Sequence, residues 1–396
     1  MKLLVISSYP EKNLIHGNKT VGVGNYTKAT LLSLVKRNPE LDIEVLAEVL
    51  DEQEEYKENK INVTRIWKRG SASSIVKLYS SALSNPAKVI LLPLEMYMYG
   101  TLLHLLITFP FLFLLKLQGK KVILVLHQVL GGSVSKFEQN NFKALFYSAF
   151  KSVFYKSLVL LTSKIIVFEE EFKKRLGSSN KVLVIPLAVM PERILDKETS
   201  KEKLGLDKDK KYVFYFGFLS PYKGIEELLN IWDPIDDVQL IIGGGGNPNH
   251  MNKPEYKTFV DNLLQKSKEK GALTTGFIPQ DQMGLYFSAV DIVILPYTVF
   301  MSSSGPLAHA FSYARGVLLS DELKEYFNSQ DMRKALELSG ITPNEICFDL
   351  NKSIRSKILW AVHNQSKLEE FSRKMFQVRS WDVLSGEYNK VIMDSA

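Results

Sequence analysis

The chain has 396 residues, of which 45% are hydrophobic and 23% charged, and its formal net charge is +7. A chain of this length and composition buries a large core and is expected to form two soluble domains rather than one. The single cysteine, Cys347, excludes an internal disulfide framework and fits a reducing compartment, so we expect a cytoplasmic protein. The positive charge is compatible with small anionic ligands, nucleic acid or an anionic membrane surface, and alone selects none of them.

The first apolar run, residues 3–6, is too short for the core of a signal peptide and predicts a strand. The stretch GNKTVGVGNYT follows and places Gly22, Gly24 and Asn25 just before the helical pattern TKATLLSLVKR. Glycine at such a position lets the backbone approach a ligand, although an ordinary loop fits the same residues. We therefore take this stretch as a candidate ligand loop.

Further apolar runs of strand length occupy residues 89–92, 122–126, 165–168 and 182–185, and segments with helical periodicity separate most of them. Runs without polar alternation, separated by helices, predict parallel strands that are covered on both faces. Glu95 and His127 follow two of these strands, at the edge where parallel sheets bind ligands. For His127, a substrate contact and a buried hydrogen bond to the backbone are equally compatible with the sequence.

One segment, TLLHLLITFPFLFLLKL at residues 101–117, approaches the minimum length of a membrane span. It contains His104 and Pro110, and a strand-like run, KVILVL, follows almost at once. We expect a buried helix in preference to a spanning one. A helix that lies in the plane of a membrane interface is the intermediate alternative.

The strand pattern pauses at the charged stretch PERILDKETSKEKLGLDKDKK and restarts with YVFYFGF, VQLIIGGGG, DIVILPY and GVLLSD. This restart predicts a second α/β unit of similar size. We place the first domain at residues 1–195 and the second at residues 196–370. Both are expected to be doubly wound sheets that face each other across a cleft, because such sheets bind ligands beyond the carboxyl ends of their strands.

Several residues of the second unit favour a bound anion. In FGFLSPYKGIEELL, Lys223 lies between a strand and a helix, where a lysine makes most sense beside a negative charge. Four glycines, residues 243–246, end the next strand and permit close approach of a flat or charged ligand. In FMSSSGPLAHAF, Pro306 opens a predicted helix, so the amides of residues 303–305 can receive phosphate or sugar oxygens, with His309 about one turn later. A core or capping role is the alternative for this segment.

These pieces, in this order, resemble the retaining glycosyltransferases of the GT-B fold, the large family four of nucleotide-sugar-dependent enzymes. The matching pieces are the glycine-bearing loop after the first strand, the strand that ends in VLHQV, and IPLAV, FGFLSPYKGIEEL, LIIGGGG, TGFIPQDQMGLYFSAVDIVILPY and GPLAHAFSYARGVLLSD. The resemblance covers nearly the whole chain. The tail RSWDVLSGEYNKV is similar to the terminal helix that crosses back onto the first domain in such enzymes, and we place that element at residues 371–396.

The resemblance implies roles for individual residues. Lys223 corresponds to the lysine that neutralises the donor's diphosphate, and His127 to the histidine that touches the donor sugar, so both are candidate catalytic residues. The residues expected on the nucleotide-sugar side are Gly217, Lys223, Gly244, Gly245, Gly276, Phe277, Ser303, Ser304, Gly305, Pro306, Leu307 and His309. The residues expected on the acceptor side are Gly22, Gly24, Asn25 and Glu95.

The sequence departs from the family pattern where two glutamates usually stand. Alignment on GPL…A…SD puts these positions at Met301 and His309. A ribose hydrogen bond at His309 would need a neutral ring nitrogen, which makes the bond weaker and dependent on pH. The arginine often found before the lysine is also missing, with Phe218 or Ser220 in its place, depending on how the loop is aligned.

Two functional hypotheses follow. The first is an active retaining glycosyltransferase that moves a hexose from a nucleoside diphosphate sugar to a glycan or lipid-linked acceptor. The second is a catalytically silent GT-B subunit that binds a partner enzyme or a glycan carrier, and the loss of both glutamates is its basis. The polar Ser-Ser-Gly turn favours the first hypothesis.

No cofactor and no metal are expected, because the sole Asp-x-Asp pattern, at residues 207–209, lies in the charged connector. Nucleic-acid binding is not expected either, since the lysines are scattered and no recognised module appears. The apolar residues 102–117 stand beside several lysines, so the first domain is a candidate for peripheral contact with the inner face of a membrane.

Overall fold

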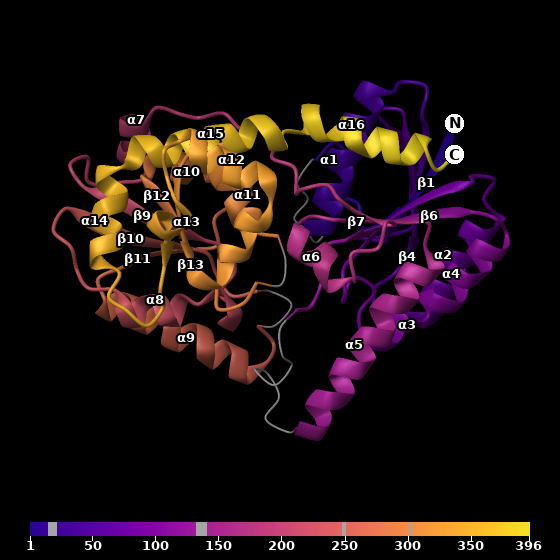
Figure 1. Ribbon diagram of the computed structural model, residues 1–396, viewed down its shortest axis with the longest axis horizontal. Coiled ribbons are helices and arrows are strands. Elements are labelled where there is room, and N and C mark those ends of the chain that lie inside the picture. The colour runs from indigo at the N-terminus through magenta and orange to yellow at the C-terminus, as the bar shows by residue number, and fades with distance from the viewer. Residues whose placement is uncertain (15–21, 132–140, 248–250, 301–302) are drawn as a thin grey trace. The chain divides into compact units, whose positions relative to one another are not determined.

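A computed structural model describes residues 1–14, 22–131, 141–247, 251–300 and 303–396 of the chain. The chain divides into two compact units, the first comprising residues 1–187 and 381–396 with Ser303, and the second residues 188–300 and 304–380. Each unit is a parallel sheet covered by helices, so the predicted doubly wound α/β class is confirmed (Figure 1). The division falls after Leu187 rather than after residue 195, because Val189 already pairs with Ser380 of the second unit.

In the first unit the strand order is β3-β4-β2-β1-β5-β6-β7-β8, and the described pairings are parallel except that of β3 with β4. The strands are β1 (Lys2–Ser7), β2 (Asp42–Glu48), β3 (Glu55–Glu58), β4 (Ile61–Trp67), β5 (Val89–Leu94), β6 (Lys121–Leu126), β7 (Lys164–Val167) and β8 (Val182–Val184). Nearly all residues of β1, β5 and β6 are buried, as expected for strands covered on both faces. In contrast, β4 alternates buried and half-buried residues.

The helices of the first unit include one from the far end of the chain. They are α1 (Gly22–Arg37), α2 (Ala72–Ser84), α3 (Leu102–Leu106), α4 (Thr108–Leu117), α5 (Asn141–Leu161), α6 (Glu170–Arg175) and α16 (Trp381–Met393). Figure 1 shows α16 lying beside α1. The Arg37 Nε donates to Ser385 Oγ at 2.9 Å, and the hydroxyls of Tyr26 and Tyr388 are hydrogen-bonded.

This returning helix is shorter than expected. It begins at Trp381, whereas the sequence placed it at residues 371–396. Residues 371–379 continue α15 (Gln365–Arg379), which packs on the second sheet. Ser380 has an extended conformation, with φ −66° and ψ 152°, and this residue separates the two helices.

The apolar segment at residues 101–117 is not one buried helix, so that expectation was wrong. It forms α3 and α4, and Leu112 and Leu115 of α4 are buried while Phe113 and Leu117 are exposed. A helix that packs by one face only leaves its opposite apolar residues in solvent. In the described parts of the chain, no helix is both long enough and apolar enough to cross a bilayer.

The second unit has the strand order β11-β10-β9-β12-β13-β14, and its described pairings are all parallel. The strands are β9 (Lys211–Phe216), β10 (Val238–Gly243), β11 (Leu273–Gly276), β12 (Ile292–Leu295), β13 (Gly316–Ser320) and β14 (Cys347–Phe348). The chain builds outward from β9 to β11 and then restarts at β12 on the other side of β9. Ligands of such sheets bind at this reversal, beyond the carboxyl ends of β9 and β12.

Helices flank this second sheet. They are α7 (Lys197–Lys203), the 3₁₀ turn η2 (Pro221–Lys223), α8 (Ile225–Ile231), α9 (Pro254–Glu269), α10 (Gln280–Ala289), α11 (Gly305–Ser312), the 3₁₀ turn η3 (Asp321–Asn328), α12 (Gln330–Leu338), α13 (Pro343–Ile346), α14 (Arg355–His363) and α15. The loops that follow β9, β10, β11 and β12 carry most of the residues predicted for the nucleotide-sugar side.

Candidate active site

Lys223 lies at the strand reversal of the second unit. Its Nζ donates a hydrogen bond to Tyr297 Oη at 2.5 Å and lies 3.9 Å from the centroid of the Tyr297 ring. Burial lowers the pKa of Lys223, and the nearby Tyr222 opposes this effect. No carboxylate of the described residues forms an ion pair with Lys223. A shielded ammonium without a counter-charge is a ready binding partner for an anion.

A chain of polar groups connects Lys223 to the beginning of α11. Tyr297 Oη is 2.9 Å from Ser304 Oγ, and Ser304 Oγ accepts a hydrogen bond from Leu307 N at 3.3 Å as the N-cap of the helix. Because the Tyr297 hydroxyl accepts from Lys223, its own hydrogen is directed to Ser304. The sequence analysis missed Tyr297, although its place just after DIVILP marked it as a residue at a strand end.

Two of the amides expected to face phosphate are already engaged. Ser304 N donates to Tyr326 Oη at 3.0 Å, and Leu307 N donates to the cap. Gly305 is exposed and Leu307 is buried. Gly305 is therefore the most accessible of these groups, because the Ser304 hydroxyl is also buried and engaged by Tyr297 and by the amide of Leu307.

Ser303 belongs to the first unit, unlike its neighbour in sequence. Its hydroxyl donates to Glu169 Oε1 at 3.1 Å, and Glu169 is itself buried. This carboxylate lies directly after β7, so the hydroxyl of Ser303 is committed to the first unit in this arrangement. Met301, the other position where a glutamate was expected, lies outside the described residues.

The loops after β9 and β10 cross at very short range. A side-chain carbon built at Gly244, which has φ +155°, would lie 1.9 Å from the carbonyl oxygen of Gly217. Leu219 N donates to the carbonyl oxygen of Gly245 at 3.0 Å, which ties the two loops together. Gly217 also approaches the ring of Pro306, so these loops lie beside the beginning of α11. The glycines are thus needed for the backbone itself, whether or not a ligand is bound.

Two exposed aromatic rings lie beside these glycines. Phe218 and Phe277 are 40% and 62% exposed, and their rings stack with centroids 6.4 Å apart and planes at 19°. Gly276 precedes Phe277 with φ +67°, and a side-chain carbon at Gly245 would lie 3.3 Å from Phe277 N. Exposed aromatic faces bind flat rings by stacking. Phe218 was considered only as a replacement for an arginine, and this pairing gives it a distinct role.

His309 lies among aromatic side chains of the second unit. Its ring is 6.0 Å from that of Phe216 and nearly perpendicular to it, and 5.8 Å from that of Phe287. Phe216 ends β9, so His309 is close to the strand reversal as expected from its place one turn into α11. These contacts show that His309 has a packing role.

In the first unit, His127 follows β6 and its ring lies between two other rings. The centroids of Tyr26 and Phe168 are 4.8 Å and 4.9 Å away, both in edge-to-face geometry. Its Nε2 is buried and has no hydrogen-bond partner among the described residues. Burial lowers the pKa of His127 to about 3, so the imidazole is neutral near pH 7. A buried nitrogen without a protein partner is unusual and leaves one position for a water molecule or a ligand group.

This environment predicts how the stability depends on pH. The pKa of His127 is about 3 in the folded state against an ordinary value of 6.5, so the unfolded chain binds an extra proton between these values. Stability due to the neutral ring is complete above pH 6.5 and is lost as the pH falls toward 3. Changing His127→Phe removes this titration and should flatten the decline by up to about 1.4 kcal/mol per pH unit. Urea unfolding of both proteins between pH 7 and pH 4.5 measures how the free energy of unfolding depends on pH. Equal slopes for the wild type and His127→Phe would contradict the burial of His127.

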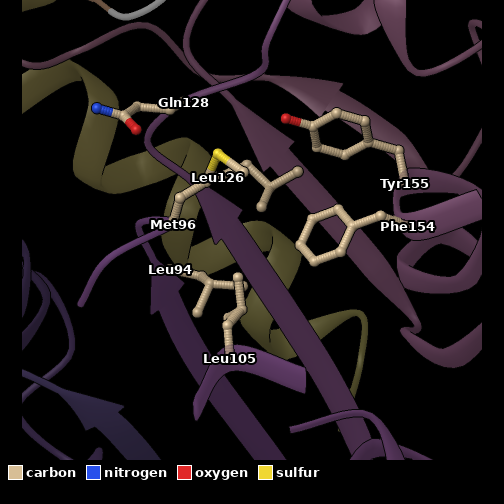
Figure 2. A pocket seen from close by; sticks show the side chains of 7 residues that line it. All are labelled: Leu94, Met96, Leu105, Leu126, Gln128, Phe154 and Tyr155. Atoms are coloured by element: carbon tan, nitrogen blue, oxygen red, sulfur yellow. The ribbon is translucent and has the colours of Figure 1, made fainter. Parts of the chain in front are cut away.

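Glu95 and a small pocket lie next to His127. Gln128 Nε2 donates to Glu95 Oε1 at 3.1 Å, and burial raises the pKa of Glu95 while Arg69 opposes the rise. The pocket is lined by Leu94, Met96, Leu105, Leu126, Gln128, Phe154 and Tyr155. Figure 2 shows the Gln128 amide and the Tyr155 hydroxyl at one end and the side chains of Leu94 and Leu105 at the other. The pocket's free volume of about 10 Å³ has room for about one water molecule, so the pocket as it stands does not hold a larger ligand.

The glycine loop of the first unit differs from expectation. Gly22, Gly24 and Asn25 lie in the first turns of α1 instead of before it, and Gly24 is buried. The helix starts early because Val23 and Tyr26 pack into the core. Residues 15–21, where the rest of that loop would lie, are outside the described part of the chain.

The residues that the structure describes contain no group of three His, Cys, Asp or Glu side chains arranged to hold a metal ion. The candidate site consists instead of a half-buried cation, a hydroxyl-capped helix and stacked aromatic rings in the second unit. Within the first unit, a neutral histidine and a carboxyl group lie at the carboxyl ends of the strands.

Comparison with known proteins shows which family model and which proteins the sequence of this chain resembles. Residues 196–310 match the family model of the glycosyl transferases group 1. A GDP-mannose:glycolipid 4-beta-D-mannosyltransferase from Xanthomonas campestris pv. campestris is 33% identical over 106 residues, which are 27% of this chain and 29% of that protein. The match thus spans less than a third of the relative's length.

Solved structures match over the whole chain at lower identity. Sucrose-phosphate synthase from Thermosynechococcus elongatus has a TM-score of 0.73 at 13% identity and covers 99% of this chain and 98% of its own. The Anabaena protein HepE in complex with UDP has a TM-score of 0.64 at 14% identity, with both chains covered fully. These likenesses confirm the GT-B fold.

Proposed function

We propose that this protein is a glycosyltransferase, because it has the GT-B fold and its residues 196–310 match the family model of the glycosyl transferases group 1. It moves a hexose from a nucleoside diphosphate sugar to a glycan or lipid-linked acceptor. The observation that supports this most strongly is Lys223, a half-buried cation at the strand reversal with no acidic partner among the described residues.

The second unit is proposed to bind the donor. Its diphosphate would lie at Lys223, near the Ser304 hydroxyl and Gly305, where the N-terminal end of α11 also favours negative charge. The nucleotide base would stack at Phe218 and Phe277. HepE, which shares the fold, was solved with UDP bound.

Lys223 is proposed to stabilise the charge that develops on the leaving diphosphate. Its ammonium is held by Tyr297, which Ser304 orients in turn, so the charge is already positioned before the reaction. The donor's phosphates supply the counter-charge that the folded protein lacks at this point. In this proposal the leaving group requires no metal, and activity should persist in a chelator such as EDTA.

The first unit is proposed to bind the acceptor. His127, which the resemblance places at the donor sugar, has a neutral ring whose Nε2 has no partner among the described residues, so it can form one hydrogen bond to a hydroxyl of that sugar. Glu95 and Gln128 form a second polar pair at the neighbouring strand end. The exposed apolar side chains of α3 and α4 favour an acceptor carried on a lipid, with the protein at the inner face of a membrane.

The proposed reaction retains the anomeric configuration. The bond between the anomeric carbon and the phosphate oxygen breaks, the acceptor oxygen bonds to the same face of that carbon, and the acceptor's proton passes to the departing phosphate. We expect an α-linked product from an α-linked donor. Proton NMR of the product formed within minutes checks this through the anomeric coupling constant. A β-linked product, the linkage in the name of the Xanthomonas relative, would contradict retention but not transfer.

A catalytically silent subunit is the second candidate. The amides of Ser304 and Leu307 are used inside the protein, and His309 packs against aromatic rings, so fewer polar groups face the donor than the family pattern implies. A silent subunit should neither transfer nor hydrolyse any common UDP-, GDP-, ADP- or dTDP-sugar. Slow release of free sugar from one of these donors would exclude this candidate.

A further inference from the structure

The net positive charge of the chain arises in one segment of the first unit that is poor in acidic residues. Residues 96–168 contain eight lysines, one glutamate, and no aspartate or arginine. Their formal charge of +7 equals that of the entire chain, so the remaining residues are neutral overall. This segment includes α3, α4 and α5. Basic residues are no denser here than elsewhere in the chain, and the segment is unusual because almost no acidic residue offsets its lysines.

The same helices expose large apolar side chains. We call the apolar-basic face the set formed by Leu103 of α3, Phe113, Leu114, Lys116 and Leu117 of α4, and Val153, Lys156 and Leu160 of α5. Leu103, Leu117, Val153 and Leu160 are each at least 64% exposed. Single exposed apolar residues are ordinary, but a cluster of this kind on neighbouring elements marks an interaction surface.

The members of this face lie on helices that pack together. The rings of Phe109 on α4 and Phe154 on α5 are 5.3 Å apart, and Lys116 Nζ donates to the carbonyl oxygen of Leu160 at 3.0 Å. On α5, Val153, Lys156 and Leu160 have the spacing of a single helical stripe, while Phe154 and Leu158 are buried on the opposite side. Apolar and cationic groups thus alternate along one surface.

We propose that the apolar-basic face binds the surface of an anionic lipid bilayer. Apolar side chains enter the boundary between headgroups and acyl chains, and the lysines remain at the level of the phosphates. A second copy of this chain is a poorer occupant, because it would bring two sets of lysines together. The helices lie on the membrane and do not cross it, since none in the described chain is long and apolar enough.

The membrane contact rests on the proposed function, because it would bring the protein to the bilayer that carries a lipid-linked acceptor. The pocket of Figure 2 is lined by Leu105 of α3 and by Phe154 and Tyr155 of α5, which are the helices that carry the face. A bilayer on this face would bring the headgroup of a lipid-linked acceptor to the same side of the unit as the pocket. The acceptor class favoured is therefore a lipid-linked sugar rather than a free glycan.

Vesicle sedimentation of the full chain tests this proposal. We expect the wild type to sediment with vesicles of phosphatidylcholine containing about one third phosphatidylglycerol, and far less with phosphatidylcholine alone, in low salt. The pair Leu117→Ser with Leu160→Ser should weaken binding about tenfold or more. The matched pair Leu338→Ser with Leu359→Ser, at exposed leucines of the second unit, should bind as the wild type does.

The basic side chains are tested separately. Lys116→Gln with Lys156→Gln should reduce binding to the anionic vesicles and leave the weak binding to neutral vesicles unchanged. No binding of the wild type to either vesicle would overturn the proposal, as would equal loss in the control pair. A wild-type dimer that becomes a monomer in Leu117→Ser with Leu160→Ser, with no vesicle binding, would instead assign the face to self-association.

Nucleotide binding, measured on the same preparations, separates this inference from the proposed function. If the vesicles fail to bind while a nucleoside diphosphate still binds, only the membrane face is wrong. If the vesicles bind and no nucleoside diphosphate does, the membrane face stands and the transferase assignment fails.

Discussion

Replacing Lys223 by methionine is expected to lower kcat/KM for sugar transfer by about 10²- to 10³-fold, the usual effect of removing one group that stabilises transition-state charge. Methionine keeps most of the side-chain volume over Tyr297 but carries no charge. The fold should remain intact, because Lys223 pairs with a neutral hydroxyl and its burial already disfavours the charge. Steady-state kinetics with the active donor measures the effect, and circular dichroism checks the fold.

Lys357→Met is the matched control for this change. Lys357 is also a lysine whose pKa burial lowers, and its Nζ lies 5.7 Å from the centroid of the Trp360 ring. It lies on α14, away from the strand reversal, so its replacement should change kcat/KM by less than about twofold. Equal losses in the two variants would assign the effect of Lys223 to general destabilisation and not to the donor's diphosphate.

Gly224→Ala should unfold or severely destabilise the second unit, by about 3 kcal/mol or more. Gly224 precedes α8 with φ +68°, and a side-chain carbon there would lie 1.7 Å from the carbonyl oxygen of Pro296. The clash cannot relax locally, because Thr298 N donates to the carbonyl oxygen of Tyr222 at 3.0 Å and holds the two loops together. Urea unfolding, followed by intrinsic fluorescence, measures the loss.

Gly284→Ala provides the comparison for that substitution. Gly284 lies inside α10, and a side-chain carbon there meets nothing nearer than Tyr313 Oη at 3.6 Å. Alanine at such a helical position should be neutral or stabilise by up to about 1 kcal/mol. If Gly224→Ala were as stable as Gly284→Ala, the close approach of the loops after β9 and β12 would be wrong.

The parts of the fold that could be predicted are those where each strand is buried on both faces. The runs that became β1, β5 and β6 are continuous and apolar, so burial was evident from the sequence. The edge strands gave weaker signals: β3 reads EYKE with one buried residue, and β11 reads LTTG with none. Strands at an edge are stabilised by their neighbours more than by their own apolar content, and a linear reading misses them.

The sequence pointed to candidate site residues where a single residue of an unusual type stands at a strand end or in a turn. Lys223 in its turn and His127 at its strand end were found because their types are unusual there. The stacking of Phe218 on Phe277 was not predictable, since it depends on how two loops distant in the sequence meet. The partners that occupy the Ser304 and Leu307 amides were missed for the same reason.

The segment at residues 101–117 shows a limit of hydropathy. Its apolar content predicted burial, but only one side of α4 can face the sheet of the first unit, and Phe113 and Leu117 are left outside. Their exposure, combined with the lysines around them, carries the membrane inference. Hydrophobic periodicity could not predict which residues of α4 are exposed, because the helix is apolar on nearly every side.

Binding of nucleoside diphosphates to the wild type and to Lys223→Met is the measurement that tests the central assignment most directly. A thermal-shift screen of UDP, GDP, ADP and dTDP, followed by calorimetry of any ligand that binds, requires neither the acceptor nor the membrane. We predict that one nucleotide stabilises the wild type and that Lys223→Met weakens its binding at least about tenfold, as expected for the loss of a charge-assisted contact. No binding by the wild type, or equal binding by both proteins, would contradict the placement of the donor's diphosphate at Lys223.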